Sequence, residues 1–395
     1  MSLATPLRRA TAAGPVVALI LLVSLNLRPG ATTVGPLLPE IRAAVGLNGF
    51  TAGLLTALPP LCFAAFGPLA PRLARRFGAA GALGVGMLLL GVGLAVRALA
   101  AEPVVFLLFS MLALGGIAIA NVLMPSVVKR EFPEKAGLVT GVYTAFLTIG
   151  AAVGAALAVP VAQSLGSWRS GLAVWGTLAL LALLVAVRCR GLTAKTDGGA
   201  RTLPPLRGSR TAWALAVFFM VNATAAYSTM GWLPQIYRDA GFSPNTAGLL
   251  LALCIAIGIP LAFVMPVLAV RRPNQRALVA VLLGTGFVAY AGLAFWPADL
   301  PWLWALLAGV SQSAFPLSLA LIGLRARTNE GVTLLSSFAQ STGYLCAVPG
   351  PIIMGVFYQW TGEWVVPLLF LMVLLVPALI GGLRAASPHV LEDEL

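Results

Sequence analysis

The chain has 395 residues, of which 59% are hydrophobic and 9% are charged, and its formal net charge is +13. A water-soluble domain carries roughly 25% charged residues, so this composition excludes an ordinary soluble fold. The positive charge does not indicate binding to nucleic acid, because the basic residues form short clusters between apolar stretches rather than one continuous face.

Apolar stretches recur along the whole chain, and each is long enough to cross a hydrocarbon core about 30 Å thick as a helix. The first follows Arg8 and Arg9 and contains no small-residue cleavage site, so we interpret it as a span and not as a signal peptide. Breaks at charged, proline-rich and glycine-rich positions predict twelve spans, at residues 14–38, 50–70, 79–100, 104–128, 136–162, 167–188, 211–236, 244–270, 276–296, 301–324, 331–358 and 364–384.

The longest hydrophilic segment joins the sixth predicted span to the seventh. It is rich in Gly, Thr, Arg and Pro, which is typical of a surface linker. The sequence therefore predicts an N-terminal six-helix half, a cytoplasmic linker, a C-terminal six-helix half and a cytoplasmic tail, at residues 1–189, 190–210, 211–385 and 386–395.

Basic residues are distributed unequally between the two ends of the predicted spans. Assigning the loops alternately to two sides leaves Arg42, Arg97, Arg169 and Arg238 on one side and, apart from Arg28, places every other Lys and Arg on the opposite side. The positive-inside rule makes the basic side cytoplasmic. We therefore expect a multi-pass protein of the cell membrane with both termini in the cytoplasm.

An internal repeat relates the two halves. A shift of 195 residues places Thr51-Ala52-Gly53-Leu54-Leu55 on the identical segment Thr246-Ala247-Gly248-Leu249-Leu250 and aligns Gly46 with Gly241. Similar composition of glycine-rich helices is the alternative explanation, but the matches lie near loops and have mixed polarity. The repeat predicts an all-α polytopic membrane protein whose twelve transmembrane helices form two pseudo-symmetric six-helix bundles, as in one large class of secondary transporters.

One charged residue is predicted to lie at membrane depth. Arg28 is about two-thirds of the way along the first span, where an ionised group that faces lipid costs several kcal/mol. All twelve acidic residues can be assigned to loops or tails, so none is expected to pair with it. Its planar guanidinium suits a small oxyanion or carboxylate. The alternative is that Arg28 extends to one surface or caps interrupted backbone near Pro29 and Gly30.

Neutral polar side chains on the first, fourth, fifth, seventh, tenth and eleventh spans are candidates to surround a central cavity and orient a small ligand. The alternative for each is a hydrogen bond between helices. Together with Arg28, the predicted substrate-binding residues are Asn26, Thr32, Asn121, Tyr143, Asn222, Tyr227, Gln312, Gln340 and Tyr344. Pro349-Gly350-Pro351 predicts a kink in the eleventh span.

Cofactor chemistry has no support in the sequence. The four cysteines stand singly, the one histidine is His389 in the tail, and no phosphate-binding loop is present. We therefore expect no metal, no cofactor and no ATP as the energy source. An enzyme is not expected either, because no cluster of His, Cys or carboxylates is predicted at membrane depth.

Three segments carry a family resemblance, and the most specific is Leu25-Asn26-Leu27-Arg28-Pro29 through Gly35-Pro36-Leu37-Leu38-Pro39-Glu40-Ile41-Arg42. This segment resembles the first-helix signature of the major facilitator superfamily and, within it, of the cyanate and nitroimidazole transporter family. Phe315-Pro316-Leu317 with Leu321-Ile322-Gly323-Leu324-Arg325, and Ala339-Gln340-Ser341 with Gly343-Tyr344-Leu345, resemble the motifs of helices ten and eleven. The resemblance covers nearly the whole chain and implies small anions or nitro-aromatic compounds as substrates.

The loop between the second and third spans departs from the superfamily pattern. That pattern has a Gly, three residues, an Asp and then a basic run, whereas here Pro71 stands where the Asp is expected. A gating salt bridge centred on that carboxylate is therefore not expected. The predicted gating or loop residues Arg72, Arg75 and Arg76 remain, and they are suited to contact helix ends or anionic lipid.

The sequence as a whole predicts a secondary transporter for a small anionic or electron-rich solute, working by rocker-switch alternating access as a monomer in the bilayer. A multidrug or antibiotic exporter is the first alternative. A membrane sensor that binds a ligand without moving it is the second. Proton coupling has no obvious carrier, because Arg does not titrate, so facilitated diffusion or anion exchange is the simpler hypothesis.

Overall fold

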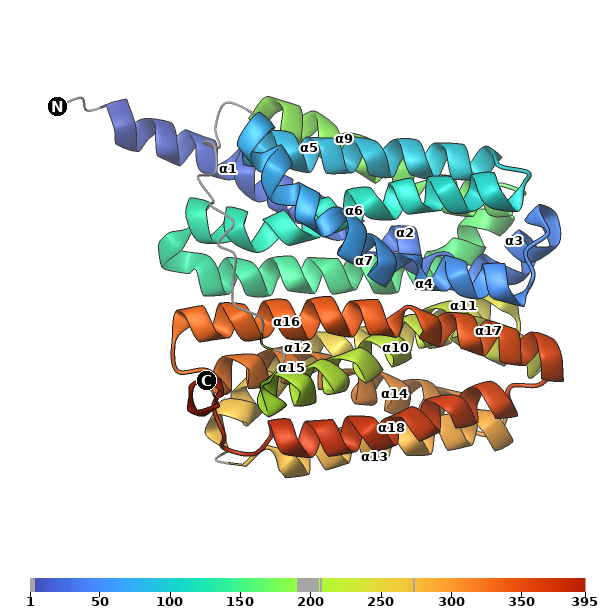
Figure 1. Cartoon of the computed structure of the whole chain (residues 1–395). Coiled ribbons are helices and arrows are strands. Elements are labelled where there is room, and N and C mark those ends of the chain that lie inside the picture. Colours follow the sequence, from blue (N-terminus) through green and yellow to red (C-terminus); the bar gives the residue numbers. More distant parts are fainter. Residues whose placement is uncertain (1–3, 190–205, 207, 273, 395) are drawn as a thin grey trace. The chain divides into compact units, whose positions relative to one another are not determined.

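A computed structural model describes residues 4–189, 206, 208–272 and 274–394 of the chain, and all regular structure in these ranges is helical (Figure 1). Contacts within the chain define two compact units. Unit 1 comprises Met1–Thr33 and Cys62–Ala200, and unit 2 comprises Val34–Leu61 and Arg201–Leu395, each taken over its described residues.

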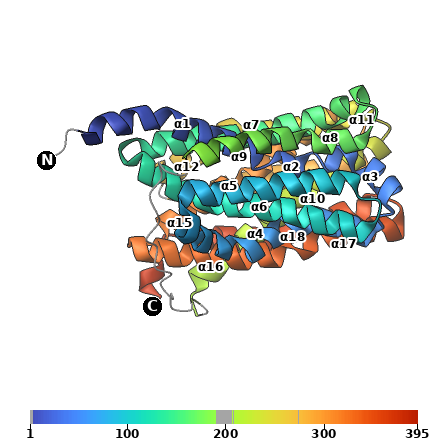
Figure 2. The same ribbon diagram turned by 90° about the horizontal axis from the view of Figure 1, so that it is seen from above.

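Unit 1 is a bundle of long helices with short connections. Glycines allow α5 and α6 to approach closely, since a methyl group added to Gly93 would lie 2.5 Å from the backbone nitrogen of Ala113. The views in Figure 1 and Figure 2 both show α5 beside α6. The elements of this unit are α1 (Ala4–Asn26), α2 (Pro29–Thr32), the end of α4 (Gly49–Phe66), η2 (Gly67–Leu69), α5 (Ala70–Leu99), α6 (Pro103–Glu131), η3 (Pro133–Lys135), α7 (Ala136–Ser164), α8 (Trp168–Ala173) and α9 (Trp175–Cys189).

Unit 2 is built around α10, which packs against α16 and α18, while α13 packs against α14 and α18. Its elements are η1 (Gly35–Leu37), α3 (Leu38–Val45), the start of α4, α10 (Arg210–Asp239), α11 (Pro244–Ala256), α12 (Gly258–Arg271), α13 (Arg276–Phe295), α14 (Pro301–Gln312), α15 (Ala314–Leu324), α16 (Asn329–Ala347), α17 (Pro349–Thr361), α18 (Val365–Ala385) and η4 (Leu391–Asp393). The predicted kink of the eleventh span is present as the step at Val348 between α16 and α17.

Over the described residues, 11 helical stretches are long and apolar enough to cross a membrane. One of them, Gly49–Leu99, has 51 residues, which at 1.5 Å per residue is more than twice the thickness of a hydrocarbon core. Its chain direction changes at Gly78, whose φ of 75° and ψ of 167° are not helical. This stretch therefore contains the predicted second and third spans, and the twelve-span prediction is confirmed.

The first span is longer than predicted. It continues through η1 and α3 to Val45, whereas the sequence placed its end near residue 38. Pro36 and Pro39 suggested termination. Each instead occupies one of the first two positions of a new helical segment, where the missing amide hydrogen of proline leaves no bond unmade.

The backbone carries the same repeat as the sequence. Gly46 and Gly241, 195 positions apart, both adopt left-handed conformations, with φ of 76° and 93°. Gly166 and Gly362, 196 positions apart, form a second left-handed pair, with φ of 70° and 71°. Glycine is favoured at these positions because it has no Cβ atom, whereas other L residues disfavour positive φ.

Helix caps repeat as well. The side chain of Asn48 accepts a hydrogen bond from the Thr51 amide at 2.8 Å, and the side chain of Ser243 accepts one from the Thr246 amide at 3.1 Å. Asn48 and Ser243 are again 195 positions apart. Two local structures of the same kind at the same offset support a common origin of the halves more strongly than composition does.

The compact units do not follow the predicted boundary between halves, so the six-plus-six division of domains stays a prediction. Val34–Leu61 belongs to the first half in sequence but packs with the C-terminal helices in unit 2. Small residues permit this, since a methyl group added to Gly53 would lie 2.6 Å from the Cα atom of Ile352. The predicted linker at 190–210 falls mostly outside the described residues.

The C-terminal tail caps two helices of unit 2. Glu392 accepts hydrogen bonds from the backbone amides of Arg327 and Thr328, each at 3.0 Å, at the start of α16. These bonds, led by the one from Arg327, lower the pKa of the Glu392 carboxyl to about 2. Asp393 forms an ion pair with the Arg327 guanidinium at 2.7 Å. Glu394 likewise accepts hydrogen bonds from Ser209 and Thr211 at the start of α10.

We expect Glu392→Ala to lower the midpoint of thermal unfolding at pH 7 by roughly 2–4 °C, because a helix loses its capping acceptor. The carboxyl has a lower pKa in the folded protein, so its contribution is complete above about 4.5 and disappears as the pH falls toward about 2. Melting curves of the purified protein in detergent at several pH values measure both effects. Glu363→Ala, in a loop with no side-chain hydrogen bond among the described residues, is the matched control, and equal effects of the two variants contradict the capping role.

Candidate functional site

The first membrane span is interrupted near its middle. A turn at Leu27 and Arg28 separates α1 from α2, and Arg28 has φ −128° and ψ −36°, which lie outside the helical region. Pro29 has no amide hydrogen, and its ring disfavours a helical conformation in the preceding residue. The Arg28-Pro29 step therefore accounts for the interruption.

The interruption places a guanidinium at membrane depth. Arg28 lies roughly 20 Å beyond Gly14, where the span begins, at 1.5 Å per residue. Its side chain is half-buried and forms no hydrogen bond or ion pair with any residue that the structure describes. Among the described carboxylates of unit 1, Glu102, Glu131 and Glu134 all lie at the ends of α6 or in η3. The charge of Arg28 thus has no counterion at its depth among the described residues of unit 1.

Buried side chains satisfy the backbone around the interruption. Asn26 donates to the carbonyl oxygen of Leu22 at 2.8 Å, and Thr32 donates to that of Arg28 at 3.3 Å. Thr33 donates to the carbonyl oxygen of Pro29 at 2.8 Å. Of the predicted site residues, Asn26 and Thr32 are therefore close to Arg28 along the chain, and Thr32 bonds the Arg28 backbone while Asn26 bonds within α1. The alternative that Arg28 itself caps this backbone is not what the structure contains.

A second arginine performs that capping. Arg97 on α5 is fully buried, and its Nη1 donates to the carbonyl oxygen of Gly30 at 3.0 Å. Its Nε and Nη2 atoms are buried without a hydrogen-bond partner in the described part of the chain. The sequence had assigned Arg97 to the outer loop side, because it stands three residues before the end of a predicted span. The sequence signal for a buried role was the position of this charged residue inside the predicted span. Arg97 points inward because its guanidinium bonds the Gly30 carbonyl at the interruption.

Helix α7 packs against the interruption through glycines. A methyl group added to Gly154 would lie 2.7 Å from the Thr32 hydroxyl oxygen and 3.1 Å from the Cα atom of Pro29. Tyr143 is half-buried two helical turns before Gly150, on the same face of α7. Gly150 itself contacts the backbone of Leu25. The predicted residue Tyr143 is therefore on the face of α7 that meets the first span.

Asn121 lies on α6, the other helix beside the interruption. A methyl group added to Gly30 would lie 3.1 Å from the Cδ1 atom of Ile117, and Asn121 follows Ile117 by one helical turn. Asn121 is half-buried and has no hydrogen-bond partner among the described residues. Its amide is free to contact a ligand.

In unit 2, two of the predicted residues meet in an aromatic cluster. The rings of Tyr227 and Tyr344 are 6.5 Å apart, and Tyr344 meets Phe219 edge to face at 4.9 Å. Phe219 also packs on Phe315 at 5.3 Å. Phe219 and Phe315 are not among the predicted site residues, which were chosen as polar side chains. Phe315 nevertheless belongs to the helix-ten segment that carries the family resemblance.

Three other predicted residues bond within unit 2. Asn222 donates to the carbonyl oxygen of Phe218 at 2.7 Å, and Gln340 donates to the Ser336 hydroxyl at 2.7 Å. Gln312, at the step between α14 and α15, donates to the sulfur of Cys254 at 3.4 Å. These bonds orient the three amides and leave part of each amide's hydrogen-bonding capacity for other partners.

The predicted gating arginines lie on the first turns of α5. Arg72, Arg75 and Arg76 are all exposed, and they precede the change of direction at Gly78. The Arg76 guanidinium lies 5.3 Å from the centre of the Phe77 ring. The structure thus places these residues between the second and third spans, where the sequence expected them.

Unit 2 also contains a polar cluster that joins segments far apart in the sequence. The Arg238 guanidinium forms an ion pair with Glu40 at 2.8 Å and donates to the carbonyl oxygen of Pro36 at 3.4 Å. Asp239 accepts hydrogen bonds from the Tyr358 hydroxyl and the Trp364 indole, both at 2.8 Å. We call these residues, together with Gln235, which bonds Asp239 at 2.7 Å, the outer cluster. It connects α3 with α10, and α10 with α17 and α18.

The described regular structure is helical, with twelve membrane spans and an internal repeat, and Arg28 at the interrupted span has no partner among the described residues. These are features of a membrane transport protein. The family model described as Major Facilitator Superfamily matches residues 20–346. The chain belongs to this superfamily and, within it, to the group that includes cyanate and nitroimidazole transporters. It is a transporter and not an enzyme.

Curated relatives match over nearly their whole lengths. The chain is 37% identical to the 2-nitroimidazole transporter of Escherichia coli (strain K12), over 94% of this chain and 95% of that one. It is 32% identical to the cyanate transport protein CynX of the same strain, over 93% and 96%. It is 36% identical to the uncharacterized transporter YycB of Bacillus subtilis (strain 168), over 91% and 90%.

Solved structures agree on the fold. A bacterial homologue of the human lysosomal transporter Spinster matches with a TM-score of 0.78 and 17% identity, over 99% of both chains. The xylose transporter XylE from E. coli matches with a TM-score of 0.72 and 13% identity, over 94% of both chains. At these identities the likeness concerns the fold alone.

We expect Arg97→Met to loosen the backbone at the interruption, because the Gly30 carbonyl loses a charged donor in an apolar interior. Loss of such a bond raises the amide exchange of residues 28–33 by roughly 10-fold or more. Hydrogen–deuterium exchange followed by mass spectrometry measures it. Arg169→Met is the control, since Arg169 also donates to a carbonyl of unit 1, that of Ala100 at 3.3 Å, but away from the interruption. Unchanged exchange in Arg97→Met refutes the capping role.

Proposed function

We propose that this protein moves a small anionic or electron-rich solute across the cell membrane by rocker-switch alternating access, and that Arg28 binds the solute. The solute class includes cyanate-like anions, small carboxylates and nitro-aromatic compounds. The observation that carries the proposal is the half-buried Arg28 guanidinium, which has no partner among the described residues at a proline-induced interruption of the first span.

Electrostatics favours an anion at this place. An unpaired charge in a poorly hydrated interior is costly, so a counterion supplied by the solute stabilises the protein while it is bound. The planar guanidinium donates two parallel hydrogen bonds to a carboxylate, and the two oxygens of a nitro group offer the same geometry with less charge. Arg97 adds a second positive charge within unit 1, with no described carboxylate to offset it at that depth.

The relatives support the same solute class. The names 2-nitroimidazole transporter and cyanate transport protein describe one nitro-aromatic compound and one small anion. A guanidinium can donate hydrogen bonds both to a nitro group and to a small anion, so one arginine suits both solutes. The aromatic cluster of Tyr227, Tyr344, Phe219 and Phe315 provides ring faces suited to an aromatic solute.

The coupling mechanism follows from the placement of carboxylates. A proton-coupled carrier needs a group that titrates near its binding site, and arginine keeps its proton. No described carboxylate of unit 1 lies in the interior of a span, since Glu102 precedes α6, Glu131 is its last residue and Glu134 lies in η3. We therefore propose facilitated diffusion or anion exchange, with both termini in the cytoplasm and a monomer as the working unit.

Within this proposal, the outer cluster is a gate. Glu40 comes from the first repeat and Arg238 from the second, and both belong to the predicted outer ends of their spans. Opening that end must separate them. An ion pair at such an accessible position is worth only about 0–1 kcal/mol, which is weak enough to break and re-form in each cycle.

We expect Arg28→Ala to reduce counterflow of cyanate and of 2-nitroimidazole in proteoliposomes by roughly 100-fold, because two charge-assisted hydrogen bonds are lost. Arg28→Lys keeps the charge but not the planar fork, so it should retain part of the cyanate flux and less of the nitroimidazole flux. Arg188→Ala, which removes an exposed arginine at the end of α9, is the control and should transport normally.

Other outcomes select the alternatives. Full flux of neutral drugs through Arg28→Ala indicates a multidrug exporter. Saturable binding of the solute without any flux indicates a sensor. Either result contradicts the proposed function.

For the gate, we expect Glu40→Gln and Arg238→Gln to raise the apparent affinity for solute added from the outer side by about two- to five-fold, since each variant destabilises the outer-closed state. The swapped variant Glu40→Arg with Arg238→Glu should restore the original value. Affinities measured in right-side-out vesicles test this. Arg327→Gln breaks the ion pair with Asp393 in the tail and serves as control. Equal affinities in the wild type and all four variants show that the pair is no gate.

A further inference from the structure

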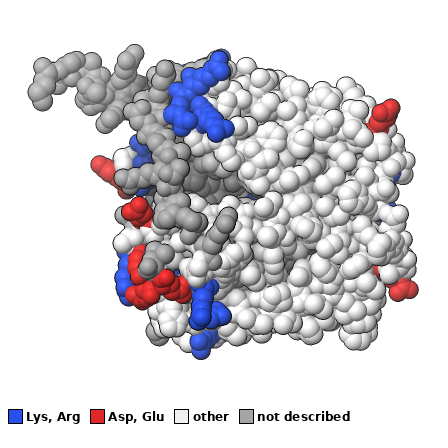
Figure 3. Space-filling view, in the orientation of Figure 1, with Lys and Arg blue, Asp and Glu red and all other residues white. Residues whose placement is uncertain are grey.

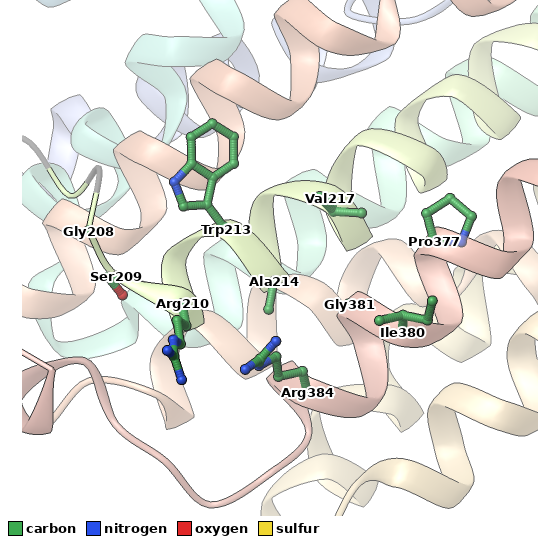
Figure 4. A pocket seen from close by; sticks show the side chains of 10 residues that line it. All are labelled: Gly208, Ser209, Arg210, Trp213, Ala214, Val217, Pro377, Ile380, Gly381 and Arg384. Atoms are coloured by element: carbon green, nitrogen blue, oxygen red, sulfur yellow. The ribbon is translucent and has the colours of Figure 1, made fainter.

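A groove runs along the surface of unit 2 between α10 and α18 (Figure 4). Trp213 and Val217 line it from α10, and Ile380 and Gly381 line it from α18. Its volume is about 340 Å³, and its walls are almost entirely apolar. The helices meet closely along the groove, since a methyl group added to Gly381 would lie 2.9 Å from the carbonyl oxygen of Ala214.

One end of the groove is basic. Figure 4 shows Arg210, at the start of α10, and Arg384, in the last turn of α18, at the end of the groove that lies away from Pro377. Both side chains are exposed, and neither forms an ion pair or hydrogen bond with any residue that the structure describes. A polar hollow of about 560 Å³ continues from this end and is lined by both arginines, Ser387 and His389.

The carboxylate of Glu394, which lines the polar hollow, is already engaged. Glu394 accepts hydrogen bonds from the hydroxyl groups of Ser209 and Thr211, at 2.6 and 2.7 Å, and from the Thr211 amide at 3.1 Å. Burial raises the pKa of Glu394, but these bonds outweigh it and lower the pKa overall. Glu394 is therefore ionised near neutral pH and offsets one of the two arginines, so the end of the groove keeps a positive charge.

The position of the groove fits the boundary of a bilayer. Both helices are membrane spans, and Arg210 and Arg384 lie in their terminal turns. Along α18 the apolar side chains of Ile380 and Val376 are 64% and 59% exposed, as lipid-facing residues are. Figure 3, in the orientation of Figure 1, shows Lys and Arg atoms at the end of α18 that leads into the tail and uncharged atoms over its middle. Trp213, a residue type enriched at membrane interfaces, stands at the basic end.

We propose that this groove is a binding site for an anionic phospholipid. The phosphate lies between the guanidinium groups of Arg210 and Arg384, and one acyl chain follows the groove past Trp213 and Ile380. The charge complementarity selects the occupant, because an apolar channel with an unpaired basic end at a membrane boundary matches an amphiphile with an anionic head. The site is in unit 2 and does not depend on the role proposed for Arg28 in unit 1.

Native mass spectrometry of the full-length protein, titrated with phosphatidylglycerol and with phosphatidylcholine of the same acyl chains, tests the proposal. We expect the wild type to bind phosphatidylglycerol more tightly, and the double variant Arg210→Gln with Arg384→Gln to lose roughly 30-fold of that affinity. The matched control is Arg271→Gln with Arg272→Gln, an exposed basic pair at the end of α12, which should keep the preference. A thermal melt of each variant in detergent establishes that it is folded.

Three results overturn the proposal. Equal affinity of the wild type for the two lipids removes the role of the phosphate charge. Competition by glycerol 3-phosphate as effective as that by the whole lipid shows a small-anion site without an acyl groove. A dimer in the wild type that the Arg210 and Arg384 variant lacks, with no lipid preference, shows that a second copy of the chain covers the groove.

Discussion

The structure depends on a single sequence step, Arg28-Pro29, which interrupts a helix in the middle of its membrane span. Proline removes one amide donor and forces the preceding residue out of the helical conformation. Backbone groups released at such depth must be satisfied inside the protein, because lipid offers no hydrogen bonds. The carbonyl oxygens of Arg28 and Pro29 accept hydrogen bonds from the amides and hydroxyls of Thr32 and Thr33, and that of Gly30 accepts one from the Arg97 guanidinium. The Arg28 side chain is left without a partner among the described residues.

The internal repeat shows that this feature belongs to one half. The offset of 195 residues that pairs Gly46 with Gly241 places Ala223 opposite Arg28 and Thr224 opposite Pro29. Without a proline there, α10 continues unbroken from Arg210 to Asp239. The two halves therefore share turns and caps but differ at the residue proposed to bind the solute. In such a carrier, the repeated segments build the helical fold, and the residues that differ between the repeats bind the solute.

Much of the fold could be predicted from the sequence, because the bilayer imposes length and hydropathy on every span. The twelve spans, the kink before Pro349 and the internal repeat all follow from local patterns. The extent of α3 and the grouping of Val34–Leu61 with the C-terminal helices could not be predicted, since they depend on contacts with residues such as Ile352 that are distant in sequence. The capping of α16 by Glu392 is similar, because a short polar tail carries no periodic signal.

In the candidate site, the sequence pointed to Arg28, which has no partner among the described residues. It did not point to Arg97, which bonds a backbone carbonyl. Arg28 was recognisable because no carboxylate shares its depth. Arg97 was assigned to a loop, since hydropathy alone does not say whether a residue near a span end faces water or the protein interior. Its role depends on the carbonyl of Gly30, which is distant in sequence and accepts a hydrogen bond from the Arg97 guanidinium. Polar residues chosen by type, such as Asn222 and Gln340, proved to bond within their own helices.

The central claim is that the Arg28 guanidinium itself contacts the transported solute, and nitrogen NMR of the arginine side chains tests it most directly. In protein labelled with ¹⁵N-arginine, the Arg28 signal is identified by its loss in Arg28→Lys. The account predicts that this signal shifts saturably when cyanate is added, over the same concentrations that saturate transport, while the Arg97 signal stays in place. An Arg28 signal that does not move as transport saturates contradicts the account.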